Sequence, residues 1–402
     1  MAKKVLILTS VYPADDAPKS FTPVVHYFAK EWVKMSCDVK VCNSVVAFPK
    51  IYYFFAKLMG LKFLSSILGF SLSDKLSDRR YTLDGVDVLR TSMQKKIPHG
   101  KFSKSEIKKQ AEKIKDFCAR DNFVPDIILG HWLNPQLELI CELKKVFPDA
   151  KNALTLHEGH SSILRLYPEN WQTLVSCVDK IGFRNEVLRR EFLEQSKLPK
   201  VKTYICYSGI PESFLESVSE HKFSKKISKF LFVGTFFKRK FPEILVESIS
   251  KSIPEKDFSL TYIGDGAMKK NILQNAKICN VENNVNLLGH IARDEIKKHM
   301  QASDCLIMVS KNEVYGLVYL EAMALGCIVI ASKNEGFDGI IKDGYNGFLC
   351  HAGNKEELSE KISQIREISE SEILSISKNA MQTASEMTDS LCAKKYLDDI
   401  FQ

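Results

Sequence analysis

Short apolar runs alternate along this chain with longer amphipathic stretches. Lys3–Thr9 and Pro125–Trp132 have the length and composition of buried strands, whereas Thr22–Lys34 repeats apolar residues at helical spacing. Further strands are expected, in chain order, within 38–48 and at 152–157, 179–184, 202–207, 229–234, 259–264, 286–288, 304–309 and 327–331, with helices between them. This alternation predicts parallel sheets covered by helices on both faces, so the expected fold class is α/β.

A polar, charged stretch at 208–228 interrupts the alternation, which restarts after Pro211. A chain of 402 residues is too long for one ordinary core. We therefore expect two doubly wound, Rossmann-like domains that face each other across a cleft, one at 1–210 and one at 211–385. The last segment, 386–402, is expected to be mainly helical.

Residues 48–72 depart from the pattern, because they are rich in aromatic and aliphatic side chains but interrupted by Lys50, Lys57 and Lys62. The lysines and glycines argue against a membrane span. Two alternatives stay open for this apolar, basic insertion. It lies in a membrane interface as a helix, or it packs on the core or on a partner subunit.

Composition narrows the function classes. The chain is 45% hydrophobic and 26% charged, which is typical of soluble globular proteins. Its eleven cysteines contain no Cys-x-x-Cys pair, so we expect reduced thiols in a cytoplasmic protein and no zinc site. The amino terminus lacks the pattern of a signal peptide. A net charge of +8 suits phosphorylated ligands or an anionic membrane, and no motif favours nucleic acid as a partner.

The most informative segment runs from Glu313 to Glu321, with the sequence Glu-Val-Tyr-Gly-Leu-Val-Tyr-Leu-Glu. A helix is predicted at 316–325, which places Glu321 on an apolar stripe and Glu313 just before the helix. Helix amino termini bind phosphate groups through their free N–H groups and the dipole. The segment therefore predicts an anion site with a carboxylate on either side. The alternative is a solvated Glu321 and a capping Glu313.

A second candidate lies in the loop after the strand at 229–234, where Lys238, Arg239 and Lys240 precede Pro242. Three cations beside a helix start suit a diphosphate, although a solvated basic loop is the common fate of such a triplet. His157 ends another predicted strand. The carboxyl edge of a parallel sheet is where ligands bind, but a lone histidine there is more often structural.

Together these segments resemble the signature of the family 4 retaining glycosyltransferases, two-domain GT-B enzymes that use nucleotide-sugar donors. The resemblance rests on the spaced glutamates, the Tyr-Gly-Leu-Val core and the Glu-Ala-Met-Ala-Leu-Gly helix that ends at Gly326. It is specific in the second half of the chain and looser in the first. There, Val11-Tyr-Pro and Gly130-His-Trp look like members that build cell-surface polysaccharides.

The resemblance implies a role for each matching residue. Glu313 would hold the sugar hydroxyls, Lys240 the diphosphate and Glu321 the ribose. His157 would orient the sugar from the first domain, which completes a catalytic set of His157, Lys240 and Glu313. The implied donor-binding residues are Thr235, Arg239, Ile291, Tyr315, Gly316, Leu317, Val318 and Glu321. No acceptor residue can be assigned.

The resemblance also implies the reaction. A sugar would move, with retention, from a nucleoside diphosphate to a hydroxyl of a glycan or lipid-linked acceptor, in cell-surface polysaccharide or glycolipid biosynthesis. Uridine is expected as the base from family frequency alone, and neither metal nor other cofactor is expected. The segment 386–402 would cross back to the first domain. The enzyme would be cytoplasmic, at the inner face of the cell membrane if residues 48–72 touch it.

Two other functions remain open. Thr235 and Phe241 stand where the family pattern has Arg and Gly, so a non-catalytic nucleotide-sugar sensor or partner subunit is an alternative. A nicotinamide-dependent oxidoreductase would also use alternating strands and helices. No complete Gly-x-Gly-x-x-Gly follows the first strand, which argues against it.

Overall fold

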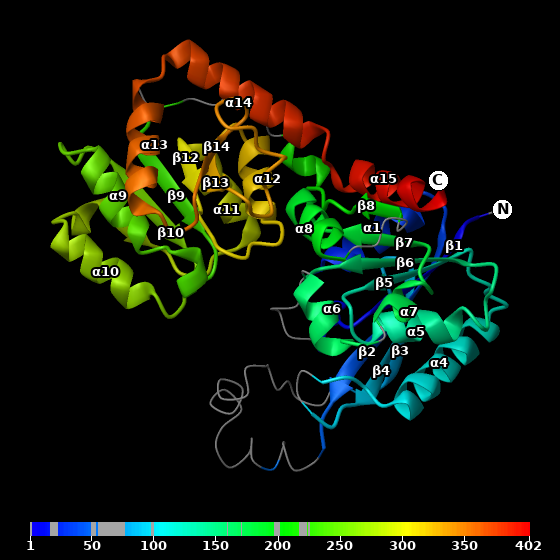
Figure 1. Cartoon of the computed structure of the whole chain (residues 1–402). Coiled ribbons are helices and arrows are strands. Elements are labelled where there is room, and N and C mark those ends of the chain that lie inside the picture. The colour runs from blue at the N-terminus through cyan, green and yellow to red at the C-terminus, as the bar shows by residue number, and fades with distance from the viewer. Residues whose placement is uncertain are drawn as a thin grey trace. The chain divides into compact units, whose positions relative to one another are not determined.

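Two parallel sheets organise the chain, and each belongs to its own compact unit (Figure 1). The computed structural model describes residues 2–16, 23–49, 54, 77–97, 100–158, 160–169, 171–196, 202–216, 223 and 226–402. The first unit comprises Met1–Arg184, Leu188–Cys206 and Cys392–Gln402, and the second comprises Asn185–Val187 and Tyr207–Leu391. The α/β class with two parallel sheets is confirmed. The predicted domain limits at 210 and 385 stay predictions.

The first sheet has eight strands in the order β3-β4-β2-β1-β5-β6-β7-β8. Their bounds are β1 Lys4–Thr9, β2 Asp38–Ala47, β3 Arg79–Leu83, β4 Val86–Gln94, β5 Ile127–His131, β6 Lys151–Leu156, β7 Lys180–Phe183 and β8 Lys202–Ile205. All neighbours are parallel except β3 and β4, which form an antiparallel hairpin at the edge. Its turn, Asp84-Gly85, has positive φ at both residues, as tight hairpins require. The predicted strand list lacked this hairpin.

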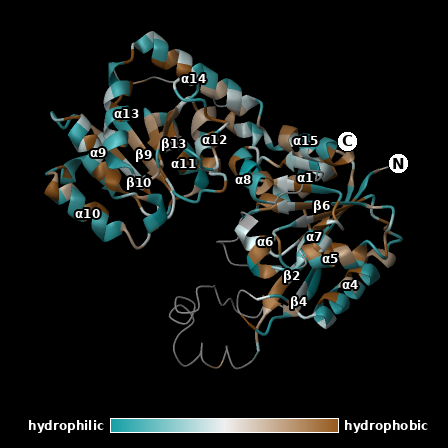
Figure 2. Ribbon diagram, viewed as in Figure 1, coloured by the Kyte–Doolittle hydropathy of each residue, from teal (hydrophilic) through white to brown (hydrophobic). Residues whose placement is uncertain are grey.

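Helices that mix hydrophobic and hydrophilic residues cover this sheet (Figure 2). They are α1 Val24–Lys34, α4 Lys104–Ala119, α5 Gln136–Leu143, α6 His160–Leu166, α7 Trp171–Val175, α8 Glu186–Ser196 and α15 Asp389–Phe401. The part of α15 from Cys392 onward belongs to the first unit. The buried Trp32 ring in α1 donates its N–H to the Ala393 carbonyl at 2.8 Å, so this end of the chain completes the first core.

The second sheet has six parallel strands in the order β11-β10-β9-β12-β13-β14. Its strands are β9 Lys229–Val233, β10 Ser259–Ile263, β11 Val285–Leu287, β12 Cys305–Ile307, β13 Ile328–Ser332 and β14 Phe348–Cys350. The α-helices are α9 Ile244–Ser252, α10 Lys269–Ile278, α11 Arg293–Ala302, α12 Leu317–Ala324, α13 Lys355–Glu367 and α14 Glu370–Ser385. Short 3-10 turns lie at η1 Glu212–Phe214, η2 Lys238–Lys240 and η3 Glu282–Asn284. The central strands β12 and β13 are wholly buried, as sheets covered on both faces require.

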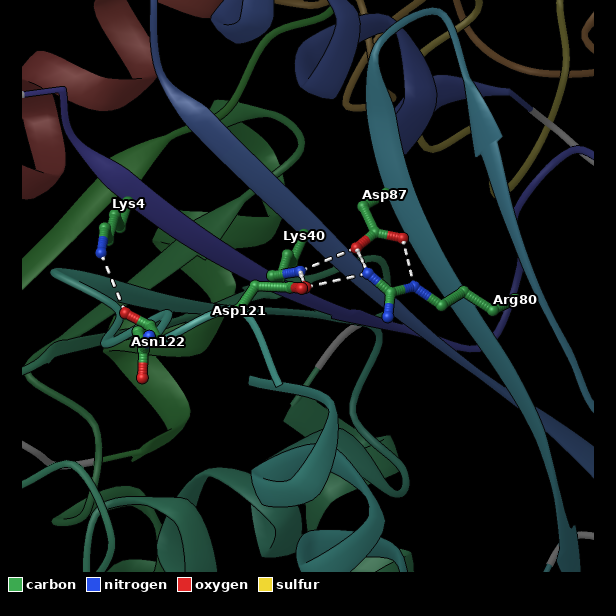
Figure 3. A network of polar contacts seen from close by, with 6 residues as sticks. All are labelled: Lys4, Lys40, Arg80, Asp87, Asp121 and Asn122. Carbon is green, nitrogen blue, oxygen red and sulfur yellow. Dashed lines mark hydrogen bonds and ion pairs between the residues drawn. The ribbon is translucent and has the colours of Figure 1, made fainter. Parts of the chain in front are cut away.

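An ion-pair network closes the amino-terminal end of the first sheet (Figure 3). The Lys40 ammonium, whose side chain is 4% exposed, lies 2.7 Å from Asp87 and 2.6 Å from Asp121. Arg80 binds the same two carboxylates at 2.6 and 2.9 Å. The parallel strands β2 and β4 begin at this end, opposite to the edge at which ligands bind in parallel sheets, so we regard the network as structural.

The insertion at 48–72 falls almost entirely outside the described residues. Within the part of the chain that the structure describes, no helix is both long and apolar enough to cross a membrane.

Candidate functional site

The candidate anion site of the second unit begins where β9 ends. Gly234 has φ +151°, and a Cβ there would lie 3.2 Å from the Lys240 ammonium. A Cβ on Gly264, at the end of β10, would lie 2.0 Å from the Gly234 carbonyl oxygen. Gly264 therefore depends on glycine for the close approach of the two strand ends, and Gly234 favours glycine because of its positive φ.

Lys240 and Glu313 meet across these loops, although they lie far apart in the sequence. The Lys240 ammonium lies 3.4 Å from Oε2 of Glu313, and both side chains are 14% exposed. Arg239 approaches the same oxygen at 3.4 Å and also donates to the carbonyls of Lys311 and Asn312. The structure thus joins two segments that the sequence suggested separately.

The helix start beside Glu313 has the geometry of an anion site. Gly316, with φ +85°, precedes α12, and a Cβ there would lie 2.5 Å from the Tyr319 ring. The first amide groups of a helix, here at Leu317 and Val318, have no intrahelical partner. Together with Lys240 and Arg239 they supply positive potential next to one carboxylate.

Some predicted donor-binding side chains are engaged with the protein. Tyr315 is buried and donates its hydroxyl to the Ser208 carbonyl at 2.6 Å. Ile291 packs partly buried against the second core. Thr235 is half-buried and its carbonyl accepts from the Phe237 amide at 2.8 Å. Because the Tyr315 hydroxyl is already bonded, a ligand would contact Tyr315 through its backbone atoms.

Glu321 forms an ion pair with Arg293 of α11, and its side chain is 13% exposed. Burial raises the pKa of the Glu321 carboxyl, while the adjacent Arg293 guanidinium opposes that rise. The sequence interpretation missed Arg293. It begins a polar helix with no motif of its own, so no local pattern marks it as a partner of Glu321.

His157 follows β6 in the first unit and lies among aromatic rings. The Trp132 ring stacks on it at 4.2 Å between centroids and 15° between planes. His131, at the end of β5, places Nδ1 3.1 Å from Nε2 of His157. Burial and the Arg184 charge lower the pKa of His131 to about 3, and they lower that of His157 well below its usual range. Both rings are therefore neutral near pH 7.

Metal ligation finds no support in the described part of the chain, where no group of three or more His, Cys, Asp and Glu side chains could hold an ion. All eleven cysteines carry free thiols.

Comparison with known proteins identifies relatives. A family model described as "Glycosyl transferases group 1" matches residues 214–382. An uncharacterized glycosyltransferase of Methanocaldococcus jannaschii is 30% identical over 245 residues, which cover 60% of this chain and 65% of that protein. The N-acetyl-alpha-D-glucosaminyl L-malate synthase of Bacillus anthracis is 30% identical over 264 residues, which cover 63% of this chain and 68% of that protein. The chain thus spans about two thirds of the length of these relatives.

A solved structure described as "Trehalose-6-phosphate from E. coli bound with UDP-2-fluoro glucose" covers 99% of this chain and 99% of its own, with a TM-score of 0.70 and 12% identity. At that identity the likeness concerns the fold alone. It confirms the expected GT-B architecture.

Proposed function

Because this chain belongs to the group 1 family of glycosyl transferases, we propose that it moves a sugar from a nucleoside diphosphate donor to a hydroxyl acceptor. The contact of Glu313 with Lys240 and Arg239 at the start of α12 carries the proposal. It combines cations and free helix amides for a diphosphate with one carboxylate for a sugar.

The proposed chemistry follows from these charges. Lys240 and the amides of Leu317 and Val318 would stabilise negative charge that develops on the departing diphosphate. Glu313 would hold the sugar hydroxyls and favour positive charge at the anomeric carbon. Retention, which the family resemblance implies, would have the departing phosphate oxygen take the proton of the acceptor hydroxyl. No protein base is then required.

Glu321 would bind the ribose hydroxyls of the donor. A carboxylate on a largely buried helix face needs a polar partner, and Arg293 supplies one in the unliganded protein. Ribose hydroxyls would share that carboxylate with Arg293, so both residues belong to the proposed nucleotide site.

Uridine diphosphate is the proposed carrier. Family frequency supports it, and so does the UDP-2-fluoro glucose bound in the solved structure of the same fold. The proposed acceptor is a glycan or a lipid-linked glycan of a cell-surface polysaccharide or glycolipid pathway, with membrane contact through residues 48–72. The resemblance of the Val11-Tyr-Pro and Gly130-His-Trp segments supports this acceptor class.

Thermal unfolding in the presence of nucleotides tests the proposal. The panel comprises the diphosphates of uridine, guanosine and adenosine and a nicotinamide dinucleotide, each with and without a chelator. A ligand at a hundred times its dissociation constant adds about 2.7 kcal/mol to the unfolding free energy. We expect a chelator-insensitive shift with one nucleoside diphosphate, followed by hydrolysis or transfer of the matching nucleotide sugar. A shift with the dinucleotide alone, or with none, would reject the proposal.

A non-catalytic nucleotide-sugar-binding protein is the second candidate. Thr235 replaces the arginine of the family pattern, and Phe241 adopts φ +48°, a left-handed conformation that suits the glycine of the pattern better. Binding of a nucleotide sugar without turnover of any donor or acceptor would favour this candidate.

A further inference from the structure

A chain of hydrogen bonds leads from His157 into the interior of the first unit. Beyond His131, whose Nδ1 faces His157, the other ring nitrogen lies 3.3 Å from the hydroxyl of Tyr396 in α15. That hydroxyl is 2.6 Å from Oγ1 of Thr155, which is 2.9 Å from the hydroxyl of Tyr204. His131, Thr155 and Tyr396 are at most 1% exposed, so water does not replace these partners.

The proton positions in this chain depend on one another. A neutral histidine carries a single N–H, and each hydroxyl carries a single O–H. If the Tyr396 hydroxyl donates to Nε2 of His131, then Nδ1–H of His131 donates to Nε2 of His157. His157 must then carry its own proton on Nδ1. If every bond is reversed, the proton of His157 lies on Nε2 instead.

The distances favour the first direction. In this direction Tyr204 donates a hydrogen bond to Thr155, Thr155 donates to Tyr396 and Tyr396 donates to His131. Every hydroxyl then has its own acceptor within 3.3 Å. In the reverse direction the Tyr204 hydroxyl has to donate to Tyr396 across 3.4 Å. Shorter donor–acceptor distances make stronger bonds, so the first arrangement is the stable one.

Aromatic packing holds the His157 ring in place while the hydrogen bonds fix its protons. Trp132, which stacks on the ring, has φ +67°, an unfavourable conformation for a residue with a Cβ. Its amide donates to the Thr155 carbonyl at 3.1 Å. Strain that the surroundings maintain in this way is concentrated at functional sites in proteins.

We propose that His131 and Tyr396 are positioning residues that fix the tautomer of His157, so that its Nδ1–H is the hydrogen-bond donor offered to a ligand at the carboxyl edge of the first sheet. The consequence for turnover rests on the proposed function, whereas the tautomer is a property of the unliganded protein. Burial and the Arg184 charge keep both histidines uncharged, which the two-tautomer argument needs. Helix α15 thereby gains a role in fixing the proton positions of His157.

Nitrogen-15 NMR of the histidine-labelled, full-length protein tests the tautomer directly, because protonated and unprotonated imidazole nitrogens have well separated shifts. His157→Gln and His131→Asn assign the two signals. We expect His157 to be protonated on Nδ1 in the wild type and Tyr396→Phe to populate the other tautomer. Tyr204→Phe is the matched control, since it removes a buried hydroxyl of the same cluster that has no bond to His131. Protonation on Nε2 in the wild type, or equal populations in both variants, would overturn the proposal.

Kinetics tests the consequence. In Tyr396→Phe we expect kcat to fall roughly tenfold, the effect of one lost hydrogen bond in the transition state, with the donor KM within about twofold. Tyr204→Phe should stay within about twofold of the wild type in both constants. His131→Asn, which keeps an N–H beside His157, should retain more activity than His131→Leu. Equal kcat values in the two tyrosine variants would overturn the positioning role. A wild type without turnover for any donor would reject the proposed function instead, and the NMR result would still decide the tautomer.

Discussion

Glu313 has two cationic partners, which makes its charge rather than its size the property to test. Glu313→Ala and Lys240→Ala should each lower turnover by roughly a hundredfold or more, because each removes a charge next to the departing group. The melting temperature should change by no more than about 3 °C, since the side chains lie at the rim of the core. Activity assays and circular dichroism of the purified variants measure both effects.

Lys238 offers the matched control. It belongs to the same basic triplet in η2, but its side chain is exposed, and the two ion pairs of Glu313 are made by Arg239 and Lys240 instead. Lys238→Ala should retain nearly full activity. Turnover by Glu313→Ala above about a tenth of the wild-type rate would contradict the assigned role, because a transition-state charge contact is worth more than that.

Glu321 couples stability to pH. Its pKa is raised by burial, so the folded state holds this proton more tightly than the unfolded chain does. Stability consequently falls as pH rises from the unfolded pKa of about 4.3 through the folded value, and the ionised carboxylate remains costly above it. Glu321→Gln removes that cost. The variant should gain melting temperature relative to wild type at pH 8 and lose this advantage at pH 4.

The same substitution should weaken binding of the nucleoside diphosphate by roughly tenfold, since a neutral amide binds ribose hydroxyls less strongly than a carboxylate. Titration calorimetry at pH 8 measures the change. A variant that is less stable than wild type at pH 8 and still binds with full affinity would show that Glu321 serves the fold alone.

At the scale of an element, the start of α12 depends on one glycine. Gly316→Ala places a Cβ 2.5 Å from the Tyr319 ring in addition to imposing a left-handed conformation. We expect a loss of about 2–4 kcal/mol in unfolding free energy, measured by urea denaturation. Gly344→Ala is the control, because its φ is +77° but nothing lies within 4 Å of the added Cβ. Equal losses in the two variants would mean that the contact with Tyr319 is unimportant.

The ion network of Lys40, Arg80, Asp87 and Asp121 joins β2, β3, β4 and the turn that follows α4 (Figure 3). Lys40→Met should cost about 1–3 kcal/mol at pH 7, because it leaves the two carboxylates with Arg80 alone. The exposed pair of Lys113 and Asp78 is the control, and Lys113→Met should cost less than about 0.5 kcal/mol. Turnover per folded molecule should be unchanged in both variants.

Acid should weaken this network in the wild type. Although burial opposes the shift, hydrogen bonds from Arg80 and Lys40 lower the pKa of Asp87, and bonds from Lys40 and then Arg80 lower that of Asp121. Depressed carboxyl pKa values stabilise the fold above the unfolded value of about 3.9, and this contribution is lost as pH falls through the folded values. Stability of Lys40→Met should therefore decline less steeply below about pH 4. A parallel decline would assign the acid sensitivity to other groups.

At the scale of the whole molecule, tryptophan distinguishes the two units. The only tryptophans in the sequence are Trp32, Trp132 and Trp171, and all belong to the first unit. The proposed nucleotide site lies in the second. A nucleoside diphosphate should therefore stabilise the second unit against unfolding, by up to about 2.7 kcal/mol at a hundred times its dissociation constant. Far-ultraviolet circular dichroism would show this as an unfolding transition at higher temperature. The transition seen by tryptophan fluorescence should move much less.

The circular dichroism and fluorescence transitions of the protein without ligand are the reference for these shifts. A shift confined to the fluorescence transition would place the nucleotide in the first unit and contradict the assignment of Lys240, Glu313 and Glu321. Each unit has its own buried core, which is the physical basis for expecting separate transitions.

The sequence by itself determined the fold class and the segments of the candidate site. Alternation of apolar runs with helical periodicity is a local signal of covered parallel strands, and it predicted β1, β9 and β13 without any knowledge of contacts. The spacing of Glu313 and Glu321 around a predicted helix start is equally local. By contrast, the β3–β4 hairpin was missed despite its Asp84-Gly85 turn, because its strands carry many charged residues and lack a long apolar run.

Tertiary structure alone decided which residues are partners. No periodicity links Arg293 to Glu321, Lys240 to Glu313 or Tyr396 to His131, because each pair joins elements that are distant in the chain and meet only when the sheets and helices pack. Burial was decided in the same way. Packing removes water around His131 and Glu321, and that desolvation, rather than residue type, shifts their pKa values. Local sequence fixes the period of an element, whereas long-range contacts and solvent exclusion give a side chain its chemistry.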